Sequence, residues 1–184
     1  MDGLDEFTTF AHAQQGRLRR LAFLLCGDWN DAQDLAQTTL LNLCLHWNRV
    51  RRADALDAYA HKALIHAYLS DRKKYQRDRA RATDFSVKAE RDFSSRPSEL
   101  PELRLALLSA LDKLAPRGRA VLVLRFWEDL SVEATAAALS CSTGNVKSQT
   151  SRALARLREI LGDSLLDADD LTPIRPARPA AQNG

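Results

Sequence analysis

The chain is poor in the residues that build metal centres and disulfide frameworks. Its 184 residues include three cysteines, Cys26, Cys44 and Cys141, with neither a CxxC pair nor a Cys/His cluster. This spacing argues against a zinc module or a disulfide scaffold, so we expect free thiols and no metal site. The four histidines lack metal-ligand spacing, and neither a Ser/His/Asp order nor a glycine-rich phosphate loop occurs. We therefore predict a protein that is not an enzyme and uses no cofactor.

Long hydrophobic runs are also missing. The longest, Leu21 to Cys26, is far too short to cross a bilayer. The opening segment MDGLDEF is acidic, whereas a secretory signal begins with basic residues and continues with apolar ones. We therefore expect a cytoplasmic protein with no membrane insertion. With 45% hydrophobic residues, a chain of 184 residues can bury one modest core or two smaller ones.

What the chain does have is helical periodicity along most of its length, and no convincing strand pattern. Helices are expected at about 4–25, 28–47, 54–75, 102–114, from 116 onward, 132–139 and 143–161. The segment 82–101 is rich in serine, proline and mixed charge, which is typical of a linker. We therefore predict an all-α fold of two small, separate helical domains at 1–81 and 102–162. A flexible linker at 82–101 joins them, and a disordered tail occupies 163–184.

The second predicted helix, capped by Asp28 or Asp31, carries an unusual outer face opposite its apolar stripe. Asp34, Leu41 and Leu45 lie on this face. Two exposed leucines beside a carboxylate favour a surface that binds a partner, because a solvated face would be more polar. The alternative is that a neighbouring helix of the same domain covers both leucines. The residues alone leave both interpretations open.

The net charge of +3 is small but unevenly distributed. Arg72–Arg81, at the end of the third predicted helix, contains six basic residues and one acid. Tyr59, Tyr68 and Tyr75 accompany these charges. Basic residues with interleaved aromatics suit melted DNA, where unstacked bases lie on rings. The alternative is that the charges complement a helix C-terminus and that the tyrosines belong to the core, but a helix end accounts for only two or three charges.

The stretch from Arg125 to Leu161 has the pattern of a helix-turn-helix. Ser131 is expected to cap the first helix, and Ser142 or Thr143 the second. The apolar face of the second helix, expected to pack on the core, is formed by Val146, Ala153, Leu154, Leu157, Ile160 and Leu161. The opposite, DNA-competent face is formed by Lys147, Ser148, Ser151 and Arg152. An ordinary solvated helix is the alternative. The helix preceding this motif begins at Pro116, and its core residues are expected to be Val121, Leu122, Leu124 and Phe126.

The order of these parts carries a resemblance to a known family. DAQDLAQTTL precedes AYAHKALIHAYLSDRKK, a linker follows, and then LRFWEDLSVEATAAALSCSTGNVKSQTSRALARLR. From about Phe7 to Leu161 the chain resembles the extracytoplasmic-function (ECF, group 4) sigma factors of the sigma-70 family. Within that group it is most similar to the actinobacterial SigE-type subgroup.

The resemblance implies a bacterial transcription initiation factor that binds core RNA polymerase and directs it to specific promoters. The first domain would correspond to sigma region 2 and the second to sigma region 4. The implied partners are promoter DNA, the β′ clamp helices and the β flap of the polymerase, and the family also admits an anti-sigma factor. The residues implied to dock on core polymerase are Asp34, Leu35, Gln37 and Leu41. Those implied to melt and read the −10 element are Tyr59, Lys62, His66, Arg72, Lys73 and Lys74. Those implied to read the −35 element are Lys147, Ser148, Ser151 and Arg152.

Two other classes of protein remain as alternatives at this point. A stand-alone helix-turn-helix regulator would need its own dimer surface or receiver, and would not need a docking face beside a basic aromatic helix. A nucleic-acid enzyme would need acidic metal ligands near the basic helix, and the sequence shows none there.

Overall fold

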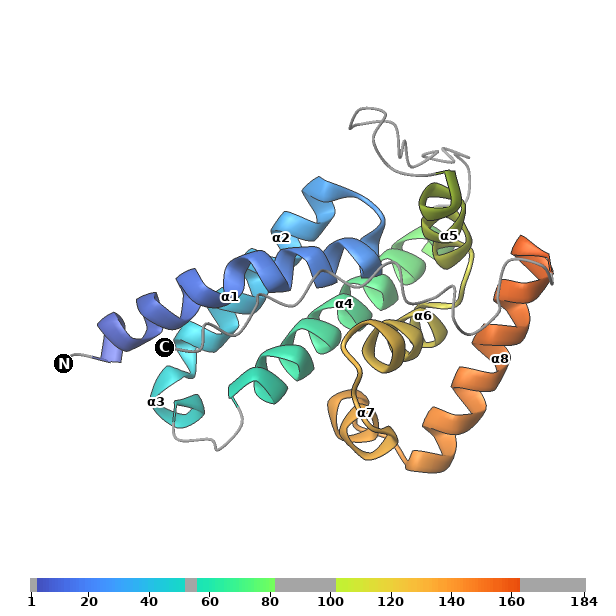
Figure 1. The fold of residues 1–184 in the computed structure, drawn as a ribbon. Helices are drawn as coiled ribbons and strands as arrows, with labels where there is room; N and C mark the ends of the chain where they lie inside the picture. Colours follow the sequence, from blue (N-terminus) through green and yellow to red (C-terminus); the bar gives the residue numbers. More distant parts are fainter. Residues whose placement is uncertain (1–2, 52–55, 82–101, 163–184) are drawn as a thin grey trace, which may run out of the picture.

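The computed structural model of the chain describes residues 3–51, 56–81 and 102–162, with side chains described to Arg72 in the second range and from Leu105 in the third (Figure 1). Within these ranges every regular element is helical, as predicted. The elements are α1 (Gly3–Cys26), α2 (Trp29–Leu45), α3 (Trp47–Val50), α4 (Leu56–Arg81), α5 (Glu102–Asp112), α6 (Pro116–Leu122), the π-helical turn η1 (Val123–Trp127), α7 (Val132–Leu139) and α8 (Thr143–Leu161). The predicted linker and tail lie outside the described residues.

The first half of the chain consists of three long helices and the short α3. α1 packs along α2, and α4 packs against both (Figure 1). α1 ends where Gly27 adopts φ 80°, a left-handed conformation that favours glycine. The carboxylate of Asp28 then accepts hydrogen bonds from the N–H groups of Asn30 (2.7 Å) and Asp31 (3.0 Å), so Asp28 is the cap of α2. The largest fully buried apolar side chains of this core are Leu18, Leu21, Leu25, Leu43, Leu64 and Ile65.

α2 ends at Leu45, earlier than the predicted end near Trp47. His46 leaves the helical conformation, with φ −112° and ψ 14°, and α3 begins at the next residue. The break places the Trp47 ring against the rings of Phe7 and Phe10, each at a centroid distance of 5.3 Å. This aromatic contact with α1 is non-local, so the spacing of apolar residues along α2 does not reveal it.

The second half packs α5, α6 and α8 around their own group of buried side chains, which are Leu107, Ala110, Leu111, Leu114, Leu122, Ala153 and Leu157. Pro116 opens α6 in its first turn, where its missing N–H leaves no helical hydrogen bond unmade. Val121, Leu122 and Leu124 are buried, as predicted.

The prediction that Phe126 belongs to this core is wrong, because 46% of its surface is exposed. The turn η1 is the cause: Glu128 N–H bonds to Val123 O (3.1 Å), five residues back. A turn of this wider kind rotates the residues that follow it relative to an α-helix. Phe126 consequently points outward, while Trp127 packs on the core and the Glu128 side chain is only 6% exposed.

α7 and α8 form the predicted helix-turn-helix, with caps supplied by the predicted residues. The Ser131 hydroxyl accepts a hydrogen bond from Ala134 N–H (3.0 Å), and the Ser142 hydroxyl accepts one from Asn145 N–H (3.2 Å). Ser140 adopts φ 50° at the end of α7, which reverses the chain between the two helices. The second helix therefore begins at Thr143, with Ser142 rather than Thr143 as its cap.

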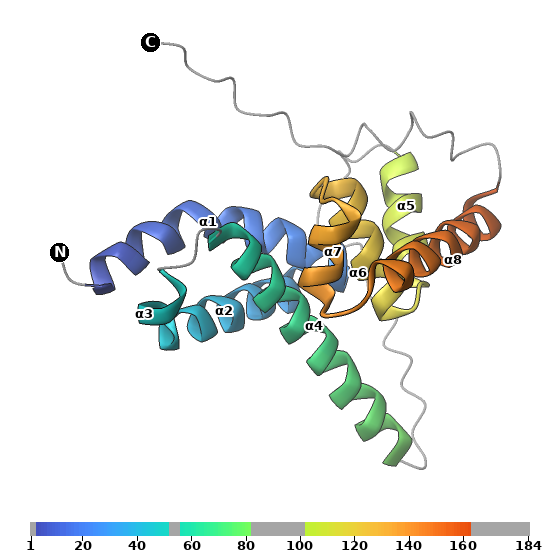
Figure 2. The same ribbon diagram turned by 90° about the horizontal axis from the view of Figure 1, so that it is seen from below.

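The two halves share an interface, although the sequence predicts two separate domains. One group of buried apolar side chains contains Leu18 and Leu64 of the first half together with Leu124 and Leu139 of the second. α4 packs against α7 and α6, and α1 packs against α5, α6 and η1. In Figure 2, α6 and α7 lie between the α1 and α4 side of the molecule and α8. The two predicted helical units are both present, and they contact one another.

The three cysteines, Cys26, Cys44 and Cys141, are not joined in disulfides in this fold, and Cys26 is buried. In the part of the chain that the structure describes, no helix combines the length and apolar character needed to cross a membrane. In the same residues, no group of three or more His, Cys, Asp or Glu side chains is placed to hold a metal ion.

Candidate nucleic-acid and protein interfaces

The outer face of α8 presents the four residues predicted to read duplex DNA. Lys147, Ser151 and Arg152 are exposed and Ser148 is half-buried. Ser148 Oγ donates to Asn145 O (3.1 Å) and lies 3.4 Å from Arg152 Nη2. The opposite face of α8 packs against the other helices of the second half through its buried residues, which are Val146, Ala153 and Leu157. The structure thus brings all four candidates onto one accessible side of a firmly packed helix, which is the arrangement a major-groove helix requires.

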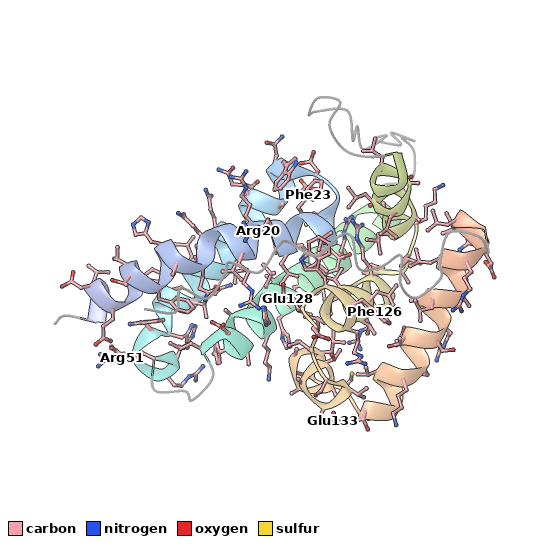
Figure 3. The ribbon with its side chains drawn as sticks, viewed as in Figure 1. Arg20, Phe23, Arg51, Phe126, Glu128 and Glu133 are labelled. Carbon is pink, nitrogen blue, oxygen red and sulfur yellow. The ribbon has the colours of Figure 1, made fainter. Side chains whose placement is uncertain are left out.

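The first helix of the motif is stabilised by charge at its N-terminus. The backbone N–H of Glu133 and the Ser131 hydroxyl hydrogen-bond the Glu133 carboxylate and hold its pKa below the usual value. A carboxylate in the first turn also interacts favourably with the helix dipole. Figure 3 shows Glu133 at the end of α7 that lies far from α1. This residue therefore supports the first helix of the motif.

One face of α4 carries three residues of the predicted −10 set. Tyr59, Lys62 and His66 are spaced by three and four residues, so they share one side of the helix. Lys62 and His66 are exposed, and the hydroxyl of half-buried Tyr59 lies 3.4 Å from Arg49 Nη2. His66 Nε2 lies 3.3 Å from Ser140 Oγ in the turn of the helix-turn-helix. This face is therefore accessible at one end and touches the second half at the other.

Farther along α4, one basic and one aromatic residue of the predicted pattern contact each other. Arg72 lies over the ring of Tyr68, 5.6 Å from its centroid. Tyr68 itself is buried, so its ring is not available for stacking on a base. Burial raises the pKa of its hydroxyl, and the charges of Arg119 and Arg72 offset part of that rise. The side chains of Lys73 and Lys74 lie outside the described residues.

The outer face of α2 holds the candidate protein-docking surface. Asp34 and Gln37 are exposed, while Leu41 and Leu45 have 64% and 78% of their surfaces open to solvent. Among the described residues, therefore, no neighbouring helix covers the two leucines. Leu35, also predicted for this surface, is 4% exposed and lies in the core, so the structure does not bring it to the face. The candidate docking surface consequently consists of Asp34, Gln37, Leu41 and Leu45.

A cluster of charges joins the two halves, and sequence reasoning missed it. Glu128 Oε2 lies 2.6 Å from Arg17 Nη2 on α1 and 3.0 Å from His61 Nε2 on α4. Arg17 Nη1 also lies 3.2 Å from Asp57 Oδ2. Figure 3 shows Glu128 near the junction of α1, α4 and α6. Arg17 and Glu128 are 111 residues apart, and no local pattern pairs residues at that distance.

The environment of Glu128 favours its ionised form. Burial alone would raise the pKa of this carboxyl, but the hydrogen bonds and charges of His61 and Arg17 outweigh burial and lower the pKa. A carboxyl with a lowered pKa stabilises the folded arrangement above its usual pKa of about 4.3. That contribution is lost as the pH falls through the lowered pKa, so it is fully present near neutral pH.

A second buried charge crosses the same interface. Arg119 is 1% exposed; its Nε donates to Leu24 O (2.6 Å) on α1, and its Nη1 lies 2.9 Å from Asp112 Oδ1. Burial lowers the pKa of Arg119, and the neighbouring Tyr68 and Asp112 act in the opposite direction. This guanidinium therefore connects α6 to both α5 and the end of α1.

Comparison with known proteins gives concordant matches to both halves. Residues 10–78 match the family model described as sigma-70 region 2, and residues 104–157 match sigma-70, region 4. The chain is 39% identical over 166 residues to the RNA polymerase sigma-E factor of Streptomyces avermitilis, covering 89% of each chain. It is 30% identical over 145 residues to the ECF RNA polymerase sigma factor EcfG of Rhodopseudomonas palustris, covering 78% of each.

A solved structure also resembles the chain across both halves. It is the sigma factor RpoE of Bartonella quintana, crystallised in complex with the anti-sigma factor NepR. The TM-score is 0.72 at 25% sequence identity, and the match covers 86% of this chain and 98% of that one.

Proposed function

This chain belongs to the sigma-70 family of RNA polymerase sigma factors, in its extracytoplasmic-function group. We propose that the exposed faces of α2, α4 and α8 each bind a different partner in transcription initiation. As a sigma factor it is a transcription initiation factor and not an enzyme. In the proposal, α2 docks on core polymerase, α4 opens and reads the −10 element, and α8 reads the −35 element. Its place of action is then the cytoplasm, where core polymerase meets the chromosome.

The docking surface on α2 is proposed to bind the β′ clamp helices. It combines an acidic and an amide side chain, Asp34 and Gln37, with two exposed leucines, Leu41 and Leu45. A desolvated apolar centre with a polar edge is the usual composition of a protein interface. The buried Leu35 holds α2 in place beneath this surface. The second half is proposed to meet the β flap.

The −10 element is proposed to meet the face of α4 that carries Tyr59, Lys62 and His66, with Arg72, Lys73 and Lys74 following the backbone. Lys62 and Arg72 offer charge to phosphates, and the Tyr59 ring is partly open for a base. His66 can donate or accept a hydrogen bond at the edge of an unstacked base. Because Tyr68 is buried, base stacking on α4 falls to Tyr59 among the described tyrosines.

The −35 element is proposed to receive α8 in its major groove. The observation that carries the proposal is the separation of the two faces of α8, since Val146, Ala153 and Leu157 are buried while Lys147, Ser151 and Arg152 are exposed. Long cationic donors suit guanine edges and phosphates, and serines permit close approach to the groove. The direct test is run-off transcription with core enzyme and a promoter library. Promoter-specific transcripts are expected only when this chain is added.

Arg152→Ala should cost about 1–3 kcal/mol of binding, because it removes a side chain able to contact a base edge. The preference of the holoenzyme should relax at one or two −35 positions and remain elsewhere. Arg158 is also exposed on α8 but lies more than one turn farther along, so Arg158→Ala is the matched control. It should weaken all promoters about equally. A saturation library of the −35 element decides the matter: a uniform loss with Arg152→Ala would assign Arg152 to a phosphate.

The free chain should bind promoter duplex weakly and with a steep dependence on salt. If the cations on α8 contact about four phosphates, affinity should fall on the order of 10²-fold between 50 and 200 mM salt. Specific, tight binding should appear only when polymerase holds both halves at the right separation. Fluorescence anisotropy of labelled promoter DNA, with and without core enzyme, measures both. Nanomolar, sequence-specific binding by the free chain at physiological salt would instead indicate a stand-alone regulator.

An anti-sigma factor is proposed as a further partner. The supporting observation is the likeness to the Bartonella sigma factor, which was crystallised in complex with NepR. Co-purification from the native organism under conditions where the regulon is silent would test this proposal, since a stoichiometric partner other than polymerase is expected.

A further inference from the structure

The contact between the two halves points to a state in which the free protein restrains itself. We propose that Glu128, with Arg17 and His61, latches region 4 onto region 2, and that the latch opens before both regions engage a promoter. This inference rests on the proposed function. It concerns the surfaces of this chain alone, so it requires no anti-sigma factor.

The latch is built from charges that belong to opposite halves. Glu128 follows η1 in the second half, whereas both of its partners, Arg17 (2.6 Å) and His61 (3.0 Å), lie in the first. The Glu128 and His61 side chains are 6% and 5% exposed, so water competes little for the hydrogen bond between them. Asp57 lies 3.2 Å from Arg17 and helps to orient it. Charged groups arranged in this way fix how the two halves meet.

The closed arrangement is incompatible with reading both promoter elements at once. The nominal positions −35 and −10 differ by about 25 base pairs, which is roughly 85 Å along B-DNA at ~3.4 Å per base pair. A compact chain of 184 residues has a radius of gyration of roughly 16 Å. Here the turn between α7 and α8 touches the −10 face itself, with His66 Nε2 3.3 Å from Ser140 Oγ. The two halves have to separate for α4 and α8 to reach their elements together.

The interface also has the character of one that opens. Two buried polar atoms at it, His61 Nδ1 and Arg119 Nη2, have no hydrogen-bond partner among the described residues. Buried polar groups without partners reduce the net stability of a contact. At the interface these unpartnered atoms offset part of the stabilisation that its buried apolar side chains provide. Core polymerase can shift such an equilibrium if it binds the open form more tightly than the closed one.

The latch predicts that weakening Glu128 opens the free protein and improves its binding to core polymerase. Glu128→Lys sets a cation against Arg17, and Glu128→Gln removes the charge while keeping the shape. The radius of gyration of the full chain, measured by small-angle scattering, should increase from wild type to Glu128→Gln to Glu128→Lys. Apparent core affinity should rise in the same order, by up to about tenfold if a tenth of the wild type is open, because the apparent dissociation constant scales inversely with the competent fraction.

Glu6→Gln is the matched control. It removes a carboxylate from an ion pair with Arg51 (2.8 Å) that lies wholly within the first half, so neither the radius nor core affinity should change. Helix content by circular dichroism should stay at the wild-type level in every variant, because both partners of Glu128 belong to the other half. If a Glu128 variant loses helix content, Arg17→Gln replaces it, since the Arg17 side chain is 41% exposed and tolerates change more readily.

The outcomes separate the latch from the proposed function. The latch would be overturned if the radius of gyration of the wild type equalled that of Glu128→Lys, or if the variants had smaller radii than the wild type. An increased radius with unchanged core affinity would also overturn it as a restraint on activity. If neither the wild type nor any variant binds core polymerase, the proposed function fails, while the scattering series still reports whether Glu128 holds the halves together.

Discussion

Asp34→Arg is expected to abolish measurable binding to core polymerase while the free protein keeps its helix content. Asp34 is exposed on α2, beside Gln37 and Leu41, and its side chain is not part of the hydrophobic core. Reversing its charge removes an ion pair with a basic partner surface and adds repulsion in its place, which together cost several kcal/mol. Each 1.4 kcal/mol corresponds to a tenfold change in affinity, so the loss should reach a hundredfold or more. A titration of labelled core enzyme measures it.

The matched control for this reversal is Asp5→Arg. Asp5 is an exposed acid in the first turn of α1, outside the α2 surface, so the same change of net charge should leave core affinity nearly unchanged. Leu41→Ala probes the apolar part of the surface and should weaken binding without lowering the free energy of unfolding, because the side chain is 64% exposed. Equal affinity for wild type and Asp34→Arg would remove α2 from the polymerase interface.

The helix-turn-helix could be predicted from the sequence because its determinants are local. The caps Ser131 and Ser142 bond to N–H groups three residues ahead, and the inward and outward faces of α8 follow from a period of 3.6 residues. The cap and outer face of α2 are local as well, but here the sequence left alternatives: Asp28 or Asp31 as the cap, and Leu41 and Leu45 exposed or covered by a neighbouring helix. A cap or a face depends on neighbours along the chain, so the order of residues is enough to find it or to narrow it to two alternatives.

Features that depend on distant contacts could not be found in this way. Phe126 was expected inside because an α-helical period continues through it, and one π-helical turn moved it outward. α2 stopped short because Trp47 packs on rings of α1. The joining of the halves depends on Arg17 and Glu128, which are 111 residues apart. Such a pairing is visible only when both helices are in place.

The buried guanidinium of Arg119 provides the largest expected effect on stability. Asp112→Asn should lower the free energy of unfolding by about 3 kcal/mol, because it leaves a charge that is 1% exposed without its carboxylate. The estimate takes the lower end of the usual range for breaking a buried pair, since the Asp112 side chain is 28% exposed and water reaches its site in part. Urea unfolding followed by circular dichroism measures the change.

Arg119→Met separates the charge from the shape of this site. A methionine fills much of the same space and carries no charge, so the desolvation cost of Arg119 disappears together with its bond to Leu24 O. We expect Arg119→Met to cost less than Asp112→Asn. In the Arg119→Met background, Asp112→Asn should then have an effect within about 0.5 kcal/mol of zero, because the charge that Asp112 neutralises is gone. An undiminished loss in the double variant would mean that Asp112 stabilises the fold through other contacts and that the ion pair with Arg119 contributes little.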